Sequence, residues 1–309
     1  MTSTPLLSKV SIGMTTCNSE LTIKRAIESV ISQSFQNWEL IIVDANSSDN
    51  TIEIVKDFSN SDQRIHLIIE QEQQIWMKLS LKELEIATGD FFMWLDADDF
   101  ISTNWIETLL KSFDETDEIC SIGLLELIDH KGMLVINNLS ALRLFKFTSS
   151  RFRLVRVSLY IMHPESFGLV NSLYGLWQID ELRYIRQNTL EKSELRFDQI
   201  FLLNALKTGK IKYNEKTTHF RRTLSRKSKI SGSSSFEFLS RDFIRFPRRI
   251  EIFEYFKCLL KDMPPVYLYF TWISRENFWA KPVYLSALLL RATLAMPVYI
   301  AKFLIKKFF

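Results

Sequence analysis

The sequence predicts an α/β fold with a mixed, mostly parallel central sheet flanked by helices. Over the first 130 residues, short apolar segments of strand length alternate with longer segments whose apolar residues recur every three to four positions. Acidic loops follow two of the strand-like segments, and ligands of open α/β sheets bind beyond the carboxyl ends of their strands. We therefore expect a ligand site along one edge of the sheet.

Periodicity and turn signals define the elements of this first part. Strands are expected at residues 10–16, 39–43, 65–69 and 91–95, and helices at 77–87 and from about 106 onward. An earlier helix should open at Asn18 or Ser19, because apolar residues recur from Ile23 at i, i+3, i+4, i+7 and i+8. Asn50 and Glu53 predict a capping box at the start of the helix that follows the second strand.

The most informative segment is Phe91–Asp99, where five largely apolar residues run into the carboxylates of Asp96, Asp98 and Asp99. Massed negative charge repels itself unless a cation or a hydrogen-bond network compensates it. A hard divalent ion with oxygen ligands, shared with the phosphates of a substrate, is the natural compensator. The alternative is a solvated turn whose aspartates cap the helix that starts near Asn104.

Two other loops should open on the same edge of the sheet. Asp44 and Asn46 follow the second strand, and the loop 15–18 follows the first. Ribose hydroxyls need carboxylate acceptors and phosphates need a cation, so this convergence predicts a nucleotide site. For Asp44 the alternative is an Asx-turn residue without a ligand.

Composition excludes several classes of protein. With 47% hydrophobic and 24% charged residues among 309, the chain can hold one large α/β domain, alone or with an appendage. A net charge of +3 argues against nucleic acid as a partner. Cys17, Cys120 and Cys258 form no metal or disulfide pattern, which fits reduced thiols. Residues 1–10 lack the features of a signal peptide, so we expect a cytoplasmic protein.

The middle of the chain carries a second group of candidate residues. Tyr174–Trp177 is expected to be a strand or turn, Asp198 begins an apolar helix, and Lys210–Tyr213 is expected to be an edge strand. The motif His219–Arg222 follows. Ten Lys or Arg stand against two acids over residues 216–250, which indicates anionic partners such as diphosphate or acidic lipid. An ordinary N-cap is the alternative role for Asp198.

The tail contains two apolar runs, 283–290 and 292–301, split by Arg291 and bent by Pro297. A central Arg costs roughly 2.5–3.5 kcal/mol on insertion scales, so an interfacial amphipathic segment is favoured over a span. We expect contact with the inner face of the cell membrane. The alternatives are a helical hairpin packed on the main domain and the interface of a homodimer.

Taken in order, the segments resemble the family-2 glycosyltransferases of GT-A fold, bacterial enzymes that extend surface polysaccharides. The resemblance covers about residues 9–225 and is carried by residues 11–18, 39–44, 87–90 and 95–99. It implies a GT-A domain over 1–225, with a nucleotide-sugar half at 9–130 and an acceptor half at 131–225. Residues 226–309 are then a basic loop and an amphipathic helical C-terminal region.

This resemblance implies a metal-dependent, inverting glycosyltransferase. It would move a sugar from a nucleotide-diphosphate donor, a UDP-sugar, to a hydroxyl of a glycan or lipid-linked acceptor, with Asp198 as the general base. The residues implied to contact the nucleotide or its diphosphate are Thr15, Cys17, Asp44, Asp96, Arg221 and Arg222. The implied ligands of Mg²⁺ or Mn²⁺ are Asp98, Asp99 as the alternate ligand, and His219.

The sequence departs from the family pattern at four places, and two other functions compete. Thr15 stands where many members have Pro, and Cys17 where they have Tyr. Residues 46–49 replace the common Gly-containing loop, and the helix at 74–85 lacks an Asn-Lys-Gly run. A sugar nucleotidyltransferase would want a Gly-rich phosphate loop with a basic residue after the first strand, which residues 15–18 do not supply. A non-catalytic, membrane-associated binding protein on the same scaffold could rest on the basic stretch 216–250.

Overall fold

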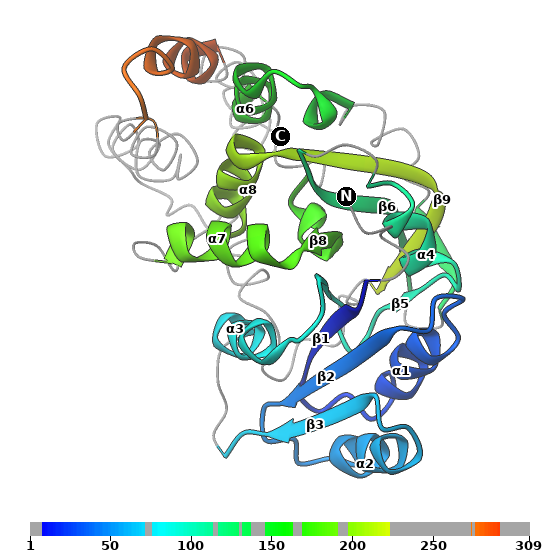
Figure 1. The fold of residues 1–309 in the computed structure, drawn as a ribbon. Coiled ribbons are helices and arrows are strands. Elements are labelled where there is room, and N and C mark those ends of the chain that lie inside the picture. The colour runs from blue at the N-terminus through cyan, green and yellow to red at the C-terminus, as the bar shows by residue number, and fades with distance from the viewer. Residues whose placement is uncertain are drawn as a thin grey trace, which may run out of the picture. The chain divides into compact units, whose positions relative to one another are not determined.

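The computed structural model shows one sheet with helices against it, together with a separate helical unit (Figure 1). The residues that it describes are 8–71, 76–113, 117–129, 132–136, 146–162, 169–190, 197–222, 273 and 276–290. The chain divides into a first unit, residues 1–151 and 167–228, and a second unit, residues 152–166 and 229–309. Residues 152–166 therefore belong with the C-terminal part of the chain, although the sequence-based division assigned them to the main domain.

Nine strands within the described residues form the sheet, in the order β3-β2-β1-β4-β8-β6-β9-β5, with β7 paired to β6. The strands are β1 (Val10–Thr16), β2 (Trp38–Asp44), β3 (Ile65–Ile69), β4 (Phe91–Trp94), β5 (Phe100–Ile101), β6 (Glu118–Ile128), β7 (Leu134–Ile136), β8 (Leu176–Gln178) and β9 (Lys210–Arg222). The helices of the first unit are α1 (Ile23–Ile31), α2 (Thr51–Ser61), α3 (Trp76–Ile86), α4 (Trp105–Leu110), α7 (Ile179–Leu190) and α8 (Phe197–Thr208), with short 3₁₀ helices η2 (Lys146–Ser149) and η4 (Leu169–Tyr174). The predicted α/β class is confirmed.

The strands β3, β2, β1 and β4 are parallel, so their carboxyl ends share one edge of the sheet. Thr16 at the end of β1 pairs with Asp44 at the end of β2, and Gly13 pairs with Trp94 at the end of β4. Every residue of β2 is buried, as expected for a strand covered on both faces. In Figure 1, α3 lies on one side of these strands and α1 with α2 on the other.

The apolar stripe of α1 is confirmed, since Ile23, Ile27 and Val30 are fully buried. The predicted capping box of α2 is wrong. Asn50 occupies the N-cap position but makes no side-chain cap hydrogen bond. The Asn50 side chain instead donates to Glu20 Oε2 at 3.0 Å, and the Asp49 carboxylate accepts from the Thr51 backbone N–H at 3.0 Å.

The strand β9 is much longer than the sequence predicted. It continues from Lys210 for 13 residues to Arg222, parallel to β6 and antiparallel to β5 at its far end. Only Thr217 and His219 are buried in its second half, and both are polar. The usual apolar alternation is therefore missing, although the pairing with β6 forms the strand. This extension brings His219–Arg222 to the loop before β5.

The second unit contains α6 (Arg153–Met162) and a helix over residues 281–290. The 281–290 helix buries Tyr284, Ala287 and Leu288 on one face. Its predicted continuation through residues 291–309, like the Ser-rich stretch 223–235, lies outside the described residues. None of the helices in the described ranges combines the length and apolar composition that crossing a bilayer requires.

Candidate active site at the carboxyl edge of the sheet

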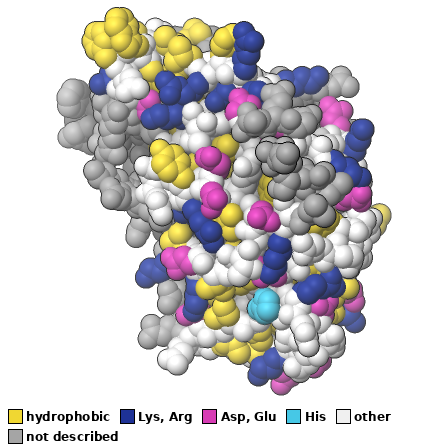
Figure 2. Space-filling model, in the orientation of Figure 1, with side chains coloured by type: hydrophobic (Ala, Val, Ile, Leu, Met, Phe, Trp, Pro, Cys, Tyr) yellow, Lys and Arg dark blue, Asp and Glu magenta, His cyan; other side chains and the backbone are white. Residues whose placement is uncertain are grey.

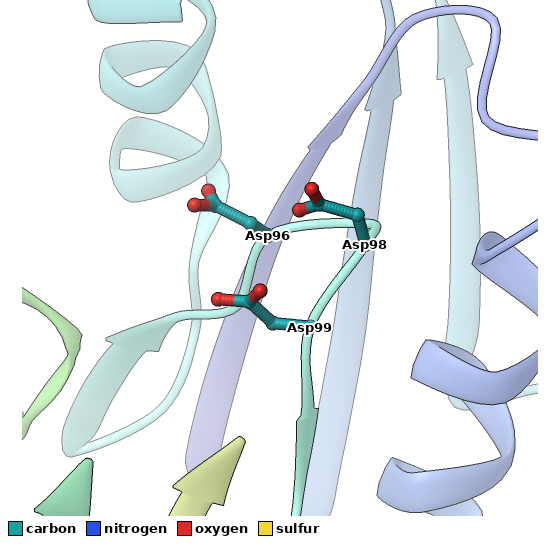
Figure 3. Close-up of side chains that lie close together, drawn as sticks. All are labelled: Asp96, Asp98 and Asp99. Carbon is teal, nitrogen blue, oxygen red and sulfur yellow. The ribbon is translucent and has the colours of Figure 1, made fainter. Parts of the chain in front are cut away.

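Three carboxylates meet on the loop between β4 and β5. Ligand oxygens of Asp96, Asp98 and Asp99 all lie within 4.8 Å of one another, and Figure 3 shows the Asp98 carboxylate turned toward Asp96. The buried strand β4 anchors the start of this acid loop, and the Leu95 N–H donates to the Gly13 carbonyl of β1 at 3.0 Å. The Asp99 N–H donates back to the Asp96 carbonyl at 3.0 Å. The predicted cluster of acids is thus present at the predicted edge.

Asp99 is the buried member of the acid loop and both its oxygens have partners. His219 Nε2 lies 2.9 Å from Oδ2, and the Arg222 backbone N–H donates to Oδ1 at 2.8 Å. The pairing of β5 with β9, which aligns Ile101 with His219, creates this contact. The Trp105 and His219 rings are perpendicular, with their centroids 5.7 Å apart. The hydrogen bond between Asp99 and His219 therefore holds the acid loop against β9.

Asp96 is oriented by a residue that lies much later in the chain. The Tyr174 hydroxyl, at the end of η4, donates to Asp96 Oδ2 at 2.7 Å. Burial and then the charge of Asp99 raise the pKa of Asp96, while the Arg221 guanidinium opposes that rise. The sequence placed Tyr174 near the sheet but gave it no role at the site. Only an ordinary tyrosine stands there in the sequence, so no local pattern marks it.

Asp98 is partly exposed, and its surroundings disfavour its ionised form. Burial first, and then the carboxylates of Asp99 and Asp96, raise its pKa to about 7. A cation that binds here has to displace a proton at neutral pH and below. Partly exposed carboxylates with raised pKa values are typical of functional sites rather than of solvated turns. The N-cap of α4 is Asn104, so these aspartates do not occupy the capping position of that helix.

Two arginines at the end of β9 face the acid loop. Arg222 Nε donates to the Asp98 carbonyl at 3.1 Å and its NH1 group to the Asp129 carbonyl at 3.3 Å. The Arg221 guanidinium lies 5.2 Å from the Tyr174 ring centroid. Tyr174 first, and then the three carboxylates of the acid loop, raise the pKa of Arg221, which keeps it charged. Negative groups of the loop are thus partly compensated by protein cations.

The loops after β1 and β2 are tied together. Asn18 and Asn46 have φ values of 50° and 61°, and the Asn18 side-chain oxygen accepts from the Ser48 N–H at 2.8 Å. Asp44 is fully buried, and its two oxygens accept from the Ser47 N–H at 2.8 Å and the Ser47 hydroxyl at 2.6 Å. Asp44 therefore shapes the loop as an Asx-turn residue would.

Thr15 and Cys17 lie at the end of β1 as predicted. The Thr15 hydroxyl donates to Glu83 Oε1 of α3 at 2.6 Å, a partner that the sequence did not suggest. Cys17 is exposed and its Sγ lies 3.9 Å from the Ala45 carbonyl. Burial, then Asp44 and Asp49, raise the pKa of the Cys17 thiol, so it is a weak nucleophile at neutral pH.

Asp198 stands at the second position of α8, as the sequence predicted. Its side chain falls outside the described residues, so the structure places the backbone of the expected general base and nothing more.

A comparison with protein families identifies the chain. The family model described as Glycosyl transferase family 2 matches residues 11–173, more than half of the chain. The chain belongs to this family.

Solved structures agree with the observed fold. The Staphylococcus aureus TarS 1–349 structure in complex with UDP-GlcNAc aligns with a TM-score of 0.54 and 17% identity, covering 90% of this chain and 79% of that one. GalNAc-T7 with UDP, GalNAc and Mn²⁺ aligns with a TM-score of 0.50 and 13% identity, covering 71% and 44%. These likenesses confirm the GT-A fold.

The curated relatives match a shorter part of this family-2 chain than the family model does. An Escherichia coli enzyme, UDP-Glc:alpha-D-GlcNAc-diphosphoundecaprenol beta-1,3-glucosyltransferase WfgD, is 34% identical over 125 residues, which are 40% of this chain and 49% of WfgD. The chain spans about half, or less, of the length of the first curated relatives that it matches.

Proposed function

We propose that this chain transfers a sugar from a UDP-sugar to a hydroxyl of a lipid-linked glycan in surface polysaccharide synthesis. The observation that carries the proposal is the acid loop at the carboxyl edge of a GT-A sheet, in a chain of glycosyl transferase family 2. The names of similar proteins support the donor and the acceptor. TarS has been solved with UDP-GlcNAc, and WfgD acts on a diphosphoundecaprenol-linked sugar.

The donor set of the acid loop fits Mg²⁺ or Mn²⁺. Carboxylate oxygens suit hard divalent cations, and three residues offer them within 4.8 Å. We assign Asp98 as the main ligand, because it is partly exposed and its carboxylate turns toward that of Asp96. Asp99 remains the alternate ligand, and His219 acts through Asp99. When bound, the cation would stabilise the negative charge that grows on the leaving diphosphate.

Protein side chains would share the remaining work on the donor. Arg221 is held positive beside the three carboxylates, and its guanidinium would donate a charge-assisted hydrogen bond to a diphosphate oxygen. Arg222 braces the acid loop through its backbone N–H and Nε. Thr15 and Cys17 border the nucleotide end of β1, and Asp44 supports them by holding the loop that carries Ser47.

An inverting single displacement also needs a base on the face of the sugar opposite the diphosphate. We assign this role to Asp198, in the first turn of α8. The N-terminal end of a helix favours the ionised carboxylate, which is the form that accepts a proton from the acceptor hydroxyl.

Turnover of UDP-sugars by Asp198→Asn tests this assignment. We expect UDP-sugar binding to persist while kcat falls by at least about a hundredfold, as for loss of a general base. Asp180→Asn is the matched control, because Asp180 also lies in the first turn of a helix but is exposed to solvent. Near-normal kcat in Asp198→Asn with an identified acceptor would contradict the role.

The second unit supports contact with an acidic membrane surface. Phe278 and Trp279 are 75% and 84% exposed, and Leu289 is 67% exposed on the helix that follows. Figure 2 shows hydrophobic side chains gathered on this segment. Residues 281–309 contain five Lys or Arg and no acid, which complements anionic lipid. We place the protein at the inner face of the cell membrane on this basis.

Vesicle flotation tests the membrane contact. Full-length protein should float with vesicles that contain phosphatidylglycerol, and Phe278→Ser with Trp279→Ser should largely remove it from them. Tyr184→Ser, at an exposed site of the first unit, is the control. Equal flotation of the double variant would contradict the contact. If the double variant instead converts a dimer to a monomer, the face is a subunit interface.

A further inference from the structure

Glu83 is a fully buried acid for which the proposed reaction has no use. Glu83 lies on α3 and is 0% exposed. Its Oε1 accepts a hydrogen bond from the Thr15 hydroxyl. Burial first, and then the charge of Asp96, raise the pKa of Glu83 well above its usual range despite the Thr15 hydrogen bond. A buried acid next to a nucleotide-site residue is unusual enough to require a role.

The strand β1 is built to admit this side chain. A Cβ at Gly13 would lie 2.6 Å from Glu83 Oε2 and 2.7 Å from Phe92 Cζ, so only glycine leaves the space. The Glu83 carboxyl therefore lies against the backbone of β1 and reaches Thr15, two residues further along. The Gly13 carbonyl also accepts from Leu95, which links the same point of β1 to the acid loop.

The hydrogen bond to Glu83 fixes what Thr15 can offer a ligand. A threonine hydroxyl has one proton to donate and lone pairs that accept. Glu83 Oε1 accepts the Thr15 proton, so the proton that the neutral Glu83 carboxyl keeps lies on Oε2, and the lone pairs of Thr15 Oγ1 remain for the ligand. Uracil carries an imide N3–H that can donate to such an acceptor. Cytosine has a bare N3 at the same place and would leave the two acceptors facing each other.

We propose that Glu83 is a positioning residue that sets Thr15 as a hydrogen-bond acceptor and so selects uracil over cytosine in the nucleotide. The inference rests on the proposed function, since it assumes that Thr15 meets the base of the donor. On this proposal the preference for uracil is set by Glu83, a residue that does not itself contact the nucleotide.

Calorimetric titration of UDP and CDP, each with Mn²⁺, tests the proposal on the full chain. In Thr15→Val, the Kd for UDP should rise about five- to tenfold, the worth of one hydrogen bond. In Glu83→Leu, the freed Thr15 hydroxyl can also donate to cytosine N3, so the Kd for CDP should fall about five- to tenfold while the Kd for UDP stays nearly constant. The double variant should bind UDP and CDP as Thr15→Val does, because Glu83 acts on the base only through the Thr15 hydroxyl. Glu83→Gln should restore the UDP preference, because its amide oxygen can accept from Thr15.

A stability control separates this role from simple packing. Leu84→Ala removes a buried neighbour on α3 and should lower the melting temperature without changing the UDP:CDP ratio. The proposal is overturned if Glu83→Leu behaves like Leu84→Ala, or if it weakens UDP and CDP equally. It is also overturned if the wild-type protein prefers CDP, in which case sugar transfer would stand with a cytidine instead of a uridine donor. Failure of the wild-type protein to bind any nucleoside diphosphate would instead overturn the proposed function itself.

Discussion

At the scale of single residues, the acids of the site differ because their surroundings differ. Asp99 is enclosed by His219 and the Arg222 backbone, whereas Asp98 is partly exposed and Asp96 is held by Tyr174. The sequence could predict the cluster, because the three acids follow one apolar run. It could not predict how they divide the work, because the partners come from residues more than 70 positions away.

Tyr174→Phe tests the orientation of Asp96. The change removes the 2.7 Å hydrogen bond and little else, so the fold should persist. We expect kcat/KM for the UDP-sugar to fall about tenfold, which corresponds to about 1.4 kcal/mol of lost transition-state stabilisation. Tyr184→Phe, at an exposed position of α7, should have no effect. Unchanged kinetics in Tyr174→Phe would show that Asp96 needs no support from this hydroxyl.

The raised pKa of Glu83 predicts how stability depends on pH. As the pH rises above the ordinary carboxyl value of 4.5, the unfolded chain releases a proton that folded Glu83 keeps. The free energy of unfolding should then fall by at most about 1.4 kcal/mol per pH unit, until the pH passes the raised value. Glu83→Gln does not titrate, so its stability relative to wild type should rise with pH.

Chemical denaturation of wild-type and Glu83→Gln protein between pH 5 and about 8 measures this difference. Glu85→Gln is the control, because Glu85 lies on the same helix and is exposed. Parallel curves for wild type and Glu83→Gln would mean that Glu83 is ionised in the folded protein.

At the scale of elements, the strands that could be predicted from the sequence were those with continuous runs of apolar residues. The strands β1 to β4 were placed to within one residue at each end, because buried parallel strands are nearly continuous apolar runs. The strand β9 was cut short after Tyr213, because its second half carries polar residues and is held by pairing with β6. The N-cap of α2 is Asn50 as predicted, but the side chain that accepts from the first turn is Asp49, because the Asn50 amide is bound to Glu20, a residue of another loop.

Asp49→Ala tests the observed cap of α2. Asp49 accepts from the Thr51 N–H at 3.0 Å and from the Glu20 N–H at 3.2 Å, so its loss should cost about 1–2 kcal/mol of unfolding free energy. Asn50→Ala is the matched control on the next residue and should cost less than about 0.5 kcal/mol, because Asn50 makes no side-chain cap bond. Equal losses in denaturant titrations of the two variants would contradict this assignment.

At the scale of the whole molecule, the topology explains why the site forms where it does. Parallel strands bring the ends of β1, β2 and β4 to one edge, which the sequence allowed us to predict. The later part of the first unit then returns to that edge through Tyr174 and the end of β9. These contacts depend on pairing between strands that are far apart in the sequence, so no local sequence pattern predicts them.

The proposed function depends most on a divalent cation held by the acid loop and shared with the diphosphate. Calorimetric titration of UDP into the full chain, with Mn²⁺ and with EDTA, tests this directly. We expect one UDP to bind with Mn²⁺, binding to weaken at least about tenfold in EDTA, and Asp98→Asn to lose the dependence on metal. Equal UDP affinity with and without Mn²⁺, or an unchanged metal dependence in Asp98→Asn, would contradict the account.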